Sequence, residues 1–271
     1  MLRSQGSRRR SKQMTPSQTH LVIIPCYNAG AKLAETVRLA LACWQPVWVV
    51  IDGSTDGSAR ALAESGGAGT GLRVLALEQN SGKGAAVLHA LVAAQPAGFT
   101  HALVLDADGQ HAVPDIPRFM QASLDKPDAM ILGVPQFAGD APASRRYGRR
   151  VGNWWANLET LWGGIADSLF GFRVYPIRES VRILESTRSA RRFDFDTELA
   201  VRLFWAGVPP VNLPTPVYYF KRAEGGTSHF RYLRDNLLLI RRHTVLVLAM
   251  LPQLKRIWQL RQRAKRGRKT T

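Results

Sequence analysis

The stretch HALVLDADGQH, His101 to His111, decides the fold that we expect for this chain. An apolar run stops at Asp106, Asp108 follows after one small residue, and Gln110 comes next. A buried strand that ends in carboxylates, an amide and an imidazole offers ligands for a divalent cation with oxygen-rich coordination. The alternative is that both aspartates only cap the following helix, because Asp is common at turns and N-caps.

Similar apolar runs lie on both sides of this stretch, and helix-compatible segments separate them. Between His20 and about Val134 the runs are LVIIP, VWVVI, LRVLAL, HALVLDAD and AMILGV. They are continuous, which suits strands covered on both faces, so we expect an α/β fold with a doubly wound, mostly parallel sheet flanked by helices. In such sheets ligands bind beyond the carboxyl ends of the strands.

The loops after the early runs carry polar groups at this edge. PCYNAG contains Tyr27 and Asn28, and DGSTDGS contains Asp52 and Ser54. These acceptors suit a base or a ribose, although the same composition is that of an ordinary turn. EQNSGKG contains Lys83 between two glycines, where a helix begins, and an ammonium beside a helix N-terminus suits a phosphate.

Composition limits the class of protein. The chain has 271 residues, of which 45% are hydrophobic, enough for one large α/β domain or two small ones. A net charge of +17 indicates a polyanionic partner such as nucleic acid, anionic lipid or a phosphorylated ligand. Cys26 and Cys43 lie in apolar surroundings, which argues for a reducing compartment and against a disulfide scaffold.

The N-terminal region does not predict an export signal, and the C-terminal region does not predict a membrane-spanning helix. Residues 1–19 are basic but lack the apolar core of a secretory signal, and we expect a disordered tail. Residues 231–254 contain the apolar pieces NLLLI and TVLVLAMLP, each shorter than the roughly 18 to 20 residues that span a bilayer. We expect an amphipathic helix there, either against anionic lipid or packed on the core, followed by a basic tail over 255–271.

A basic and aromatic segment follows the regular alternation. RRYGRRVGNWWANLETLWGG contains Arg145, Arg146, Arg149 and Arg150, followed by paired tryptophans. It could bind a nucleic acid with stacked bases, grip the phosphate of a lipid carrier at a membrane, or form an amphipathic helix whose tryptophans pack in the core.

Acidic residues mark two later segments. Asp167 and Arg173 bracket a glycine turn and a short strand in ADSLFGFRVYP. Asp194, Asp196 and Glu198 open the helix of RFDFDTELAVRLFWAG. The helix dipole favours acidic residues there, but three in five positions exceed what capping requires.

The last segment before the amphipathic helix predicts an edge strand and a loop. VNLPTPVYYF contains prolines, which confine a strand to a sheet edge. The loop KRAEGGTSHF leads to His229 and Arg231, which could close over a diphosphate or belong to a plain surface loop.

Two other enzyme classes match less well. NSGKG lacks the first glycine and the Ser or Thr of a P-loop. VLDADG resembles the motif of haloacid-dehalogenase-like phosphatases, with Asp106 as nucleophile and Asp108 as acid, but in that family the motif usually lies on the first strand.

Several segments, in this order, resemble glycosyltransferase family 2, and most closely its dolichyl- or polyprenyl-phosphate sugar synthase branch. They are VIIPCYN, VIDGSTDGS, NSGKGAAVLHAL, LDADGQH, DSLFGFRVYP and FDFDTELAVRLFWAG, within about residues 21–229. The resemblance implies a GT-A fold, a UDP- or GDP-hexose donor, an inverting transfer and Mg²⁺ or Mn²⁺. It also implies donor contacts from Pro25, Tyr27, Asn28, Asp52, Ser54, Lys83 and Asp106, and metal contacts from Asp106, Asp108 and Gln110.

The acceptor decides which further groups are needed. A polyprenyl phosphate arrives ionised and requires no base, and the groups that would hold it are Arg145, Arg146, Arg149, Arg150, His229 and Arg231. A hydroxyl acceptor requires a general base, for which Asp196 is the first candidate and Asp167 the second. Lys83, Arg173 and His229 could assist the departing diphosphate.

Two departures from the family pattern affect these expectations. Many relatives have two consecutive acidic residues where this chain has Ile51 and Asp52, which affects the identity of the donor. The motifs lead us to expect a GT-A domain over 20–230. The C-terminal transmembrane helices of some relatives are missing, so we expect a protein peripheral to the cytoplasmic face of a membrane. We expect no nucleic acid partner, and nothing in the sequence predicts an oligomeric state.

Overall fold

The computed structural model describes residues 15–58, 60, 62, 71–137, 143–187, 191–192, 194–218 and 232–267, with the backbone alone in 143–147, 232–240 and 264–267. The strands are β1 His20–Cys26, β2 Val47–Asp52, β3 Leu72–Leu77, β4 His101–Val104, β5 Met130–Phe137, β6 Arg173–Pro176 and β7 Pro210–Val217. The helices are α1 Ala31–Cys43, α3 Lys83–Ala94, α4 Ile116–Asp125, α5 Ala143–Glu159, α6 Ile177–Ser186, α7 Phe195–Ala206, α8 Tyr232–Met250 and α9 Leu254–Gly267, with short 3-10 turns η1 Val113–Asp115 and η3 Leu251–Gln253.

The strands form a seven-stranded sheet in the order β3-β2-β1-β4-β6-β5-β7. All neighbours are parallel except β6, which runs antiparallel to both β4 and β5. The expected mostly parallel, doubly wound sheet is confirmed, and β7 is the edge strand that its prolines predict. The antiparallel β6 brings Arg173 opposite Val104, at the carboxyl end of β4.

Two apolar layers cover the sheet because successive side chains of a strand point to opposite faces. In β1, Leu21 and Ile23 pack with α3 and α7, whereas Val22 and Ile24 pack with α1 and α4. The edge strand β3 differs from the expectation of a strand covered on both faces, since most of its side chains are partly or largely exposed.

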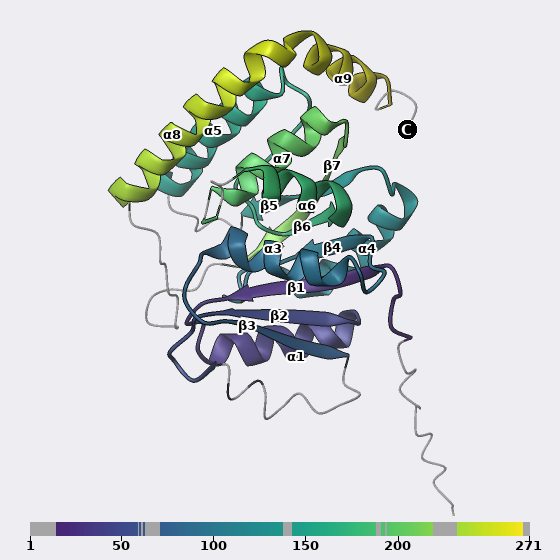
Figure 1. The fold of residues 1–271 in the computed structure, drawn as a ribbon, viewed down its shortest axis with the longest axis vertical. Coiled ribbons are helices and arrows are strands. Elements are labelled where there is room, and N and C mark those ends of the chain that lie inside the picture. Colours follow the sequence, from purple (N-terminus) through teal and green to yellow (C-terminus); the bar gives the residue numbers. More distant parts are fainter. Residues whose placement is uncertain are drawn as a thin grey trace, which may run out of the picture.

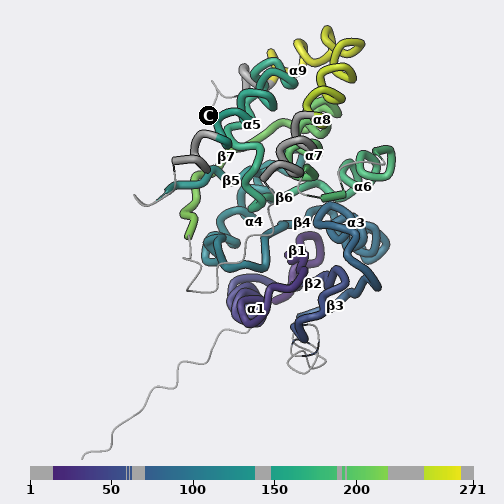
Figure 2. The backbone as a smooth tube through the Cα atoms, turned by 90° about the vertical axis from the view of Figure 1, so that its left-hand side faces the viewer, coloured from purple at the N-terminus to yellow at the C-terminus, as the bar shows by residue number. Residues whose placement is uncertain are grey.

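A further group of helices lies outside α7. Figure 1 shows α5 and α8 side by side with α9 beyond them, and Figure 2 shows the same three helices gathered at the end of the molecule opposite β3. The segment expected as a basic tail from residue 255 instead forms α9 as far as Gly267. Ile257 explains this difference, because its apolar side chain is buried in the same core as α7.

Candidate active site

The loops that follow β1 and β2 are joined to each other at the carboxyl edge of the sheet. The backbone N–H of Asn28 donates to Ser54 Oγ at 3.0 Å, and Asn28 Oδ1 accepts from the Thr55 N–H at 2.8 Å. Pro25 is buried within β1, whereas the side chain of Tyr27 is exposed beside this junction. Tyr27 and the partly exposed Asn28 and Ser54 are therefore accessible at this junction, and their contact with a donor nucleotide stays a prediction.

Asp52, at the end of β2, fixes the loop that precedes α3. Its two carboxylate oxygens accept from the backbone N–H groups of Ser81 at 2.7 Å and Gly82 at 2.8 Å. Gly82 has φ of 98° and lies against the Arg191 carbonyl, where a Cβ would come within 2.3 Å. Asp52 thus anchors the start of α3 and the place of Lys83, and its contact with a donor stays a prediction.

Lys83 joins two carboxylates from distant parts of the chain. Its Nζ lies 2.7 Å from Asp106 Oδ1 and 2.8 Å from Asp196 Oδ2. Burial alone would lower the pKa of Lys83, but Asp106 and Asp196 together hold the pKa above its ordinary value, so the ammonium is charged. Gly171 closes this space, because a Cβ there would lie 2.5 Å from Nζ.

The turn after β4 presents its carboxylates at the strand tip. The Asp106 N–H donates to His111 Nδ1 at 3.1 Å, so the ring of neutral His111 carries its proton on Nε2, 3.7 Å from Asp106 Oδ2. Burial lowers the pKa of His111, whose ring packs edge-on against Phe170. His111 therefore shapes the turn.

Neither aspartate caps a helix. The residue at the N-cap of η1 is Ala112 and that of α4 is Asp115, which removes the capping interpretation. Burial, and then the charge of Asp106, raise the pKa of Asp108, whose Oδ1 accepts only the nearby Gln110 N–H at 3.0 Å among the described contacts. This excess of negative charge is what a cation would relieve.

The donor set suits a metal that shares its coordination with a substrate. No group of three or more His, Cys, Asp or Glu side chains converges on one point within the described residues. Mg²⁺ is commonly bound by one or two carboxylates plus substrate phosphates and water, which two aspartates at a strand tip can supply. Asp106 and Asp108 fit such an ion, and Gln110, partly exposed beside them, stays a predicted third ligand.

Arg173 and Asp167 make structural contacts in this arrangement, and their catalytic roles stay predictions. The guanidinium of Arg173 is fully buried and donates to the carbonyl oxygens of Phe170 at 2.6 Å and Asp196 at 2.6 Å. Asp167 Oδ1 accepts from Arg149 at 2.7 Å and from the backbone N–H groups of two residues of the following turn. Both residues therefore position the turn and the start of α7 around Lys83.

Asp196 is the acidic residue of α7 that reaches the site. It is 5% exposed, its Oδ2 binds Lys83, and its Oδ1 is buried without a hydrogen-bond partner among the described residues. Asp194 and Glu198, in the same helical turn, instead pair with Arg242 of α8. In the amino-acid sequence, Arg242 stands in a short basic interruption between the apolar pieces NLLLI and TVLVLAMLP.

The arginine segment lies in α5. Arg149 pairs with Asp167, and Arg150 is exposed. Arg145 and Arg146 belong to the same helix, but their side chains are not described. The predicted acceptor residues His229 and Arg231 lie outside the described residues.

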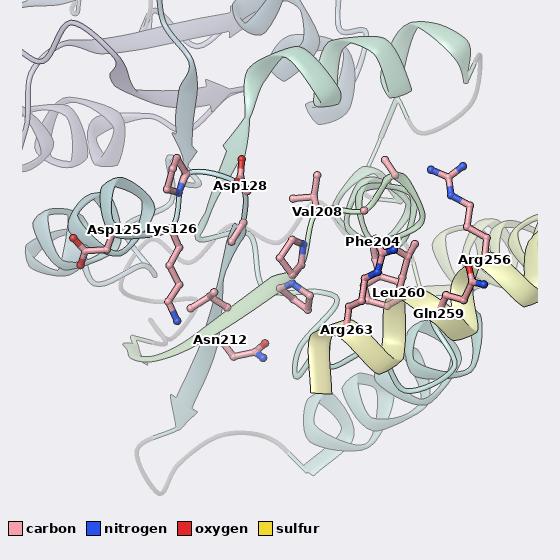
Figure 3. A pocket seen from close by; sticks show the side chains of 17 residues that line it. Asp125, Lys126, Asp128, Phe204, Val208, Asn212, Arg256, Gln259, Leu260 and Arg263 are labelled. Carbon is pink, nitrogen blue, oxygen red and sulfur yellow. The ribbon is translucent and has the colours of Figure 1, made fainter. Parts of the chain in front are cut away.

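A cavity of about 1100 Å³ lies away from the strand-tip cluster formed by Lys83, Asp106, Asp108 and Asp196 (Figure 3). It opens between α9 and the amino ends of β5 and β7, with Arg256, Leu260 and Arg263 on one wall and Lys126 and Asn212 on the other. In a parallel sheet the amino ends of the strands lie at the edge opposite to the ligand site, so the strand-tip cluster is the better candidate.

The chain was compared with known proteins. A family model described as glycosyl transferase family 2 matches residues 21–180. Polyprenol monophosphomannose synthase of Mycolicibacterium smegmatis is 31% identical over 233 residues, covering 83% of this chain and 86% of the relative. Glycosyltransferase AglJ of Haloferax volcanii is 29% identical over 223 residues, covering 79% and 67%.

Solved structures show the same fold. Glucosyl-3-phosphoglycerate synthase of Mycobacterium tuberculosis, in complex with Mn²⁺, UDP-glucose and phosphoglyceric acid, gives a TM-score of 0.59 at 18% identity over 86% of this chain and 79% of that one. S. aureus TarS 1-349 with UDP gives 0.54 at 17% identity over 85% and 65%. These likenesses confirm the GT-A fold, and the family match excludes the phosphatase alternative.

Proposed function

The chain belongs to glycosyl transferase family 2, and from this we propose that it transfers a sugar from a nucleotide-sugar to a polyprenyl phosphate with the help of Mg²⁺ or Mn²⁺. Relatives whose names state such acceptors support the lipid, among them the polyprenol monophosphomannose synthase and a UDP-N-acetylglucosamine–dolichyl-phosphate N-acetylglucosaminyltransferase of Methanococcus voltae, 26% identical over 200 residues. The observation that carries the proposal is the pair Asp106 and Asp108 at the tip of β4, beside the β1 and β2 loops.

The site residues divide the chemistry as follows. Tyr27 and Asn28 face the donor base and ribose, and Asp106 and Asp108 hold the cation. A bound divalent ion would stabilise the negative charge of the departing nucleoside diphosphate. The Lys83 ammonium adds positive charge at the same point, where its two carboxylate partners hold it.

A phosphate acceptor needs cations and no base. Arg150 is exposed near the middle of α5, and the neighbouring Arg149 is held by Asp167. Their guanidinium groups suit bidentate contacts with a phosphate. We assign the acceptor phosphate to this middle part of α5.

A hydroxyl acceptor is the second candidate, and one observation favours it. The Oδ1 atom of Asp196 is buried and lacks a hydrogen-bond partner in the described part of the chain. Because Oδ2 of the same carboxylate binds Lys83 at the proposed reaction centre, Oδ1 could accept the proton of a hydroxyl. Asp196→Asn distinguishes the acceptors. It would reduce the rate of transfer to a hydroxyl about a thousandfold and affect the rate of transfer to a phosphate much less.

We also propose that the protein is peripheral to the cytoplasmic face of a membrane. No helix among the described residues is both long and apolar enough to cross a bilayer. Large apolar side chains are nevertheless exposed on α5, α8, η3 and α9, namely Trp154, Leu248, Leu251 and Trp258. Tryptophan favours the headgroup region, and the chain's net charge of +17 suits anionic lipid.

Vesicle sedimentation tests the membrane part. Leu248→Asp should weaken binding to vesicles that contain anionic lipid, because it places a charge on the exposed face of α8. Leu124→Asp is the matched control, since Leu124 is also exposed but lies on α4. Equal binding by both variants would refute this surface as the membrane contact.

The donor part is tested with a panel of UDP- and GDP-sugars, with and without Mn²⁺ or Mg²⁺, followed by nucleotide release and melting temperature. We expect a metal-dependent response to one donor, lost in Asp108→Asn and kept in the control Asp128→Asn, an exposed carboxylate at the other edge of the sheet. A response without metal, or one that survives in Asp108→Asn, would contradict the assignment.

A further inference from the structure

Helix α8 has an inner face that packs in the same core as α7 and an outer face that is exposed. Arg242, Leu246 and Met250 are buried, whereas Arg241 and Leu248 are exposed. Within the inner face Arg242 is a charged group that no part of the proposed chemistry uses. It lies 8% exposed, so its charge requires buried partners.

Those partners are the two acidic neighbours of Asp196. Arg242 Nη2 and Nε donate to Asp194 Oδ2 at 2.7 and 3.1 Å, and Nη1 lies 2.7 Å from Glu198 Oε2. Asp194 is the N-cap residue of α7 and Glu198 lies in its first turn, so the guanidinium spans the turn that contains Asp196. One side chain of α8 thus binds both ends of that turn.

Electrostatics explains why the turn needs this side chain. Asp194, Asp196 and Glu198 place three buried carboxylates within five positions. Lys83 neutralises Asp196, and Arg202 contacts the Oε1 atom of Glu198. Without Arg242, Asp194 would lose this ion pair and Glu198 one of its two, and buried carboxylates that lose their cation repel each other and draw in water.

We propose that Arg242 is a positioning residue that ties α8 to the first turn of α7 and thereby holds Asp196 against Lys83. The proposal rests on the proposed function only in assigning Asp196 and Lys83 to the reaction centre. A lysine could not replace it fully, because an ammonium is a single point of charge whereas the three guanidinium nitrogens reach two carboxylates at once. The outer face of α8, which carries Leu248, would be coupled to the reaction centre through this contact.

The test compares Arg242→Ala and Arg242→Lys with Arg241→Ala, which removes the same charge from the exposed neighbouring position. Hydrogen exchange of the first-turn amides of α7, such as that of Glu198, which donates to the Asp194 carbonyl at 3.1 Å, reads the positioning without any substrate. We expect exchange at least about tenfold faster in Arg242→Ala, an intermediate rate in Arg242→Lys and the wild-type rate in Arg241→Ala.

Steady-state kinetics with the donor identified in the nucleotide-sugar panel then measure how the Arg242 variants affect catalysis. We expect kcat of Arg242→Ala to fall about 10- to 100-fold, because misplacement of catalytic groups is costly, while KM for the donor changes less than about threefold. KM should change little because Tyr27 and Asn28, which we assign to the donor base and ribose, lie in the loop after β1, and Asn28 is hydrogen-bonded to the loop after β2. If Arg242→Ala does not fold, Arg242→Lys carries the test.

Wild-type exchange in the Arg242 variants, or fast exchange with unchanged kcat, would overturn the proposal. A parallel loss in kcat and donor affinity would also overturn it, since this indicates general damage. If the wild-type protein transfers no sugar at all, the proposed function fails, and the exchange rates still decide whether Arg242 holds the turn.

Discussion

Removal of the Lys83 charge is the perturbation whose consequence follows most directly from the geometry. The Nζ atom lies 2.7 Å from Asp106 and 2.8 Å from Asp196, so the two carboxylate oxygens are at most about 5.5 Å apart. Two unit negative charges at that separation repel by about 3 kcal/mol at an effective dielectric constant of 20. Solvent reduces this value, because a third of the Asp106 side chain is exposed, and about 1 to 3 kcal/mol remains.

We therefore expect Lys83→Met to lose up to about 3 kcal/mol of stability in urea unfolding and about 10²- to 10³-fold in kcat, the usual effect of losing one stabilising charge at a reaction centre. Lys83→Met combined with Asp196→Asn should regain stability, since the repulsion is gone, without regaining kcat. Lys83→Arg should also be poorly active, because Gly171 leaves no room for a guanidinium. A Lys83→Met enzyme with kcat within threefold of wild type would refute the reasoning.

Further predictions concern the pH dependence of stability, the close contact between Gly171 and Lys83, and the turn after α5. Burial and the neighbouring His101 lower the pKa of His20 to about 4, so between pH 6.5 and 4 the unfolded chain binds more protons and stability falls as the pH falls. His20 should account for about 2 kcal/mol of the stability lost between pH 7 and pH 5 in urea unfolding, and His20→Gln should reduce the loss by about this amount. Gly171→Ala should displace the flexible end of Lys83 and reduce kcat at least about tenfold while the melting temperature changes by only a few degrees. Asp167→Asn should lose less than about tenfold in activity because its oxygens hold a turn, and a thousandfold loss would restore its candidacy as a base.

The part of the fold that sequence predicts best is the part fixed by local pattern. The continuous apolar runs identify β1, β2 and β4, and the parallel-sheet rule then places the residues that follow them at one edge. The order of the strands is less accessible, because β6 enters between β4 and β5 in the opposite direction. A four-residue strand carries too little pattern to reveal its direction.

The partners of charged residues are the part that sequence does not give. Lys83 was predicted to contact a phosphate, and the structure places it between carboxylates that are far from it in the chain. The sequence predicts that Arg173 assists the departing diphosphate, and the structure shows its side chain fully buried with hydrogen bonds to the carbonyl oxygens of Phe170 and Asp196. Such pairings depend on tertiary packing, which brings the turn after β4 and the start of α7 against Lys83. Helix dipole arguments alone leave Asp194 and Glu198 as possible caps.

The central claim is that Asp106 and Asp108 hold a cation for sugar transfer to a lipid phosphate. The most direct measurement is transfer of labelled sugar from the panel of nucleotide-sugars to a polyprenyl phosphate, followed by extraction into organic solvent. We predict a labelled lipid product that requires Mg²⁺ or Mn²⁺ and is absent with Asp108→Asn. A product formed equally in excess chelator or by Asp108→Asn, or no labelled lipid with any donor, would contradict it.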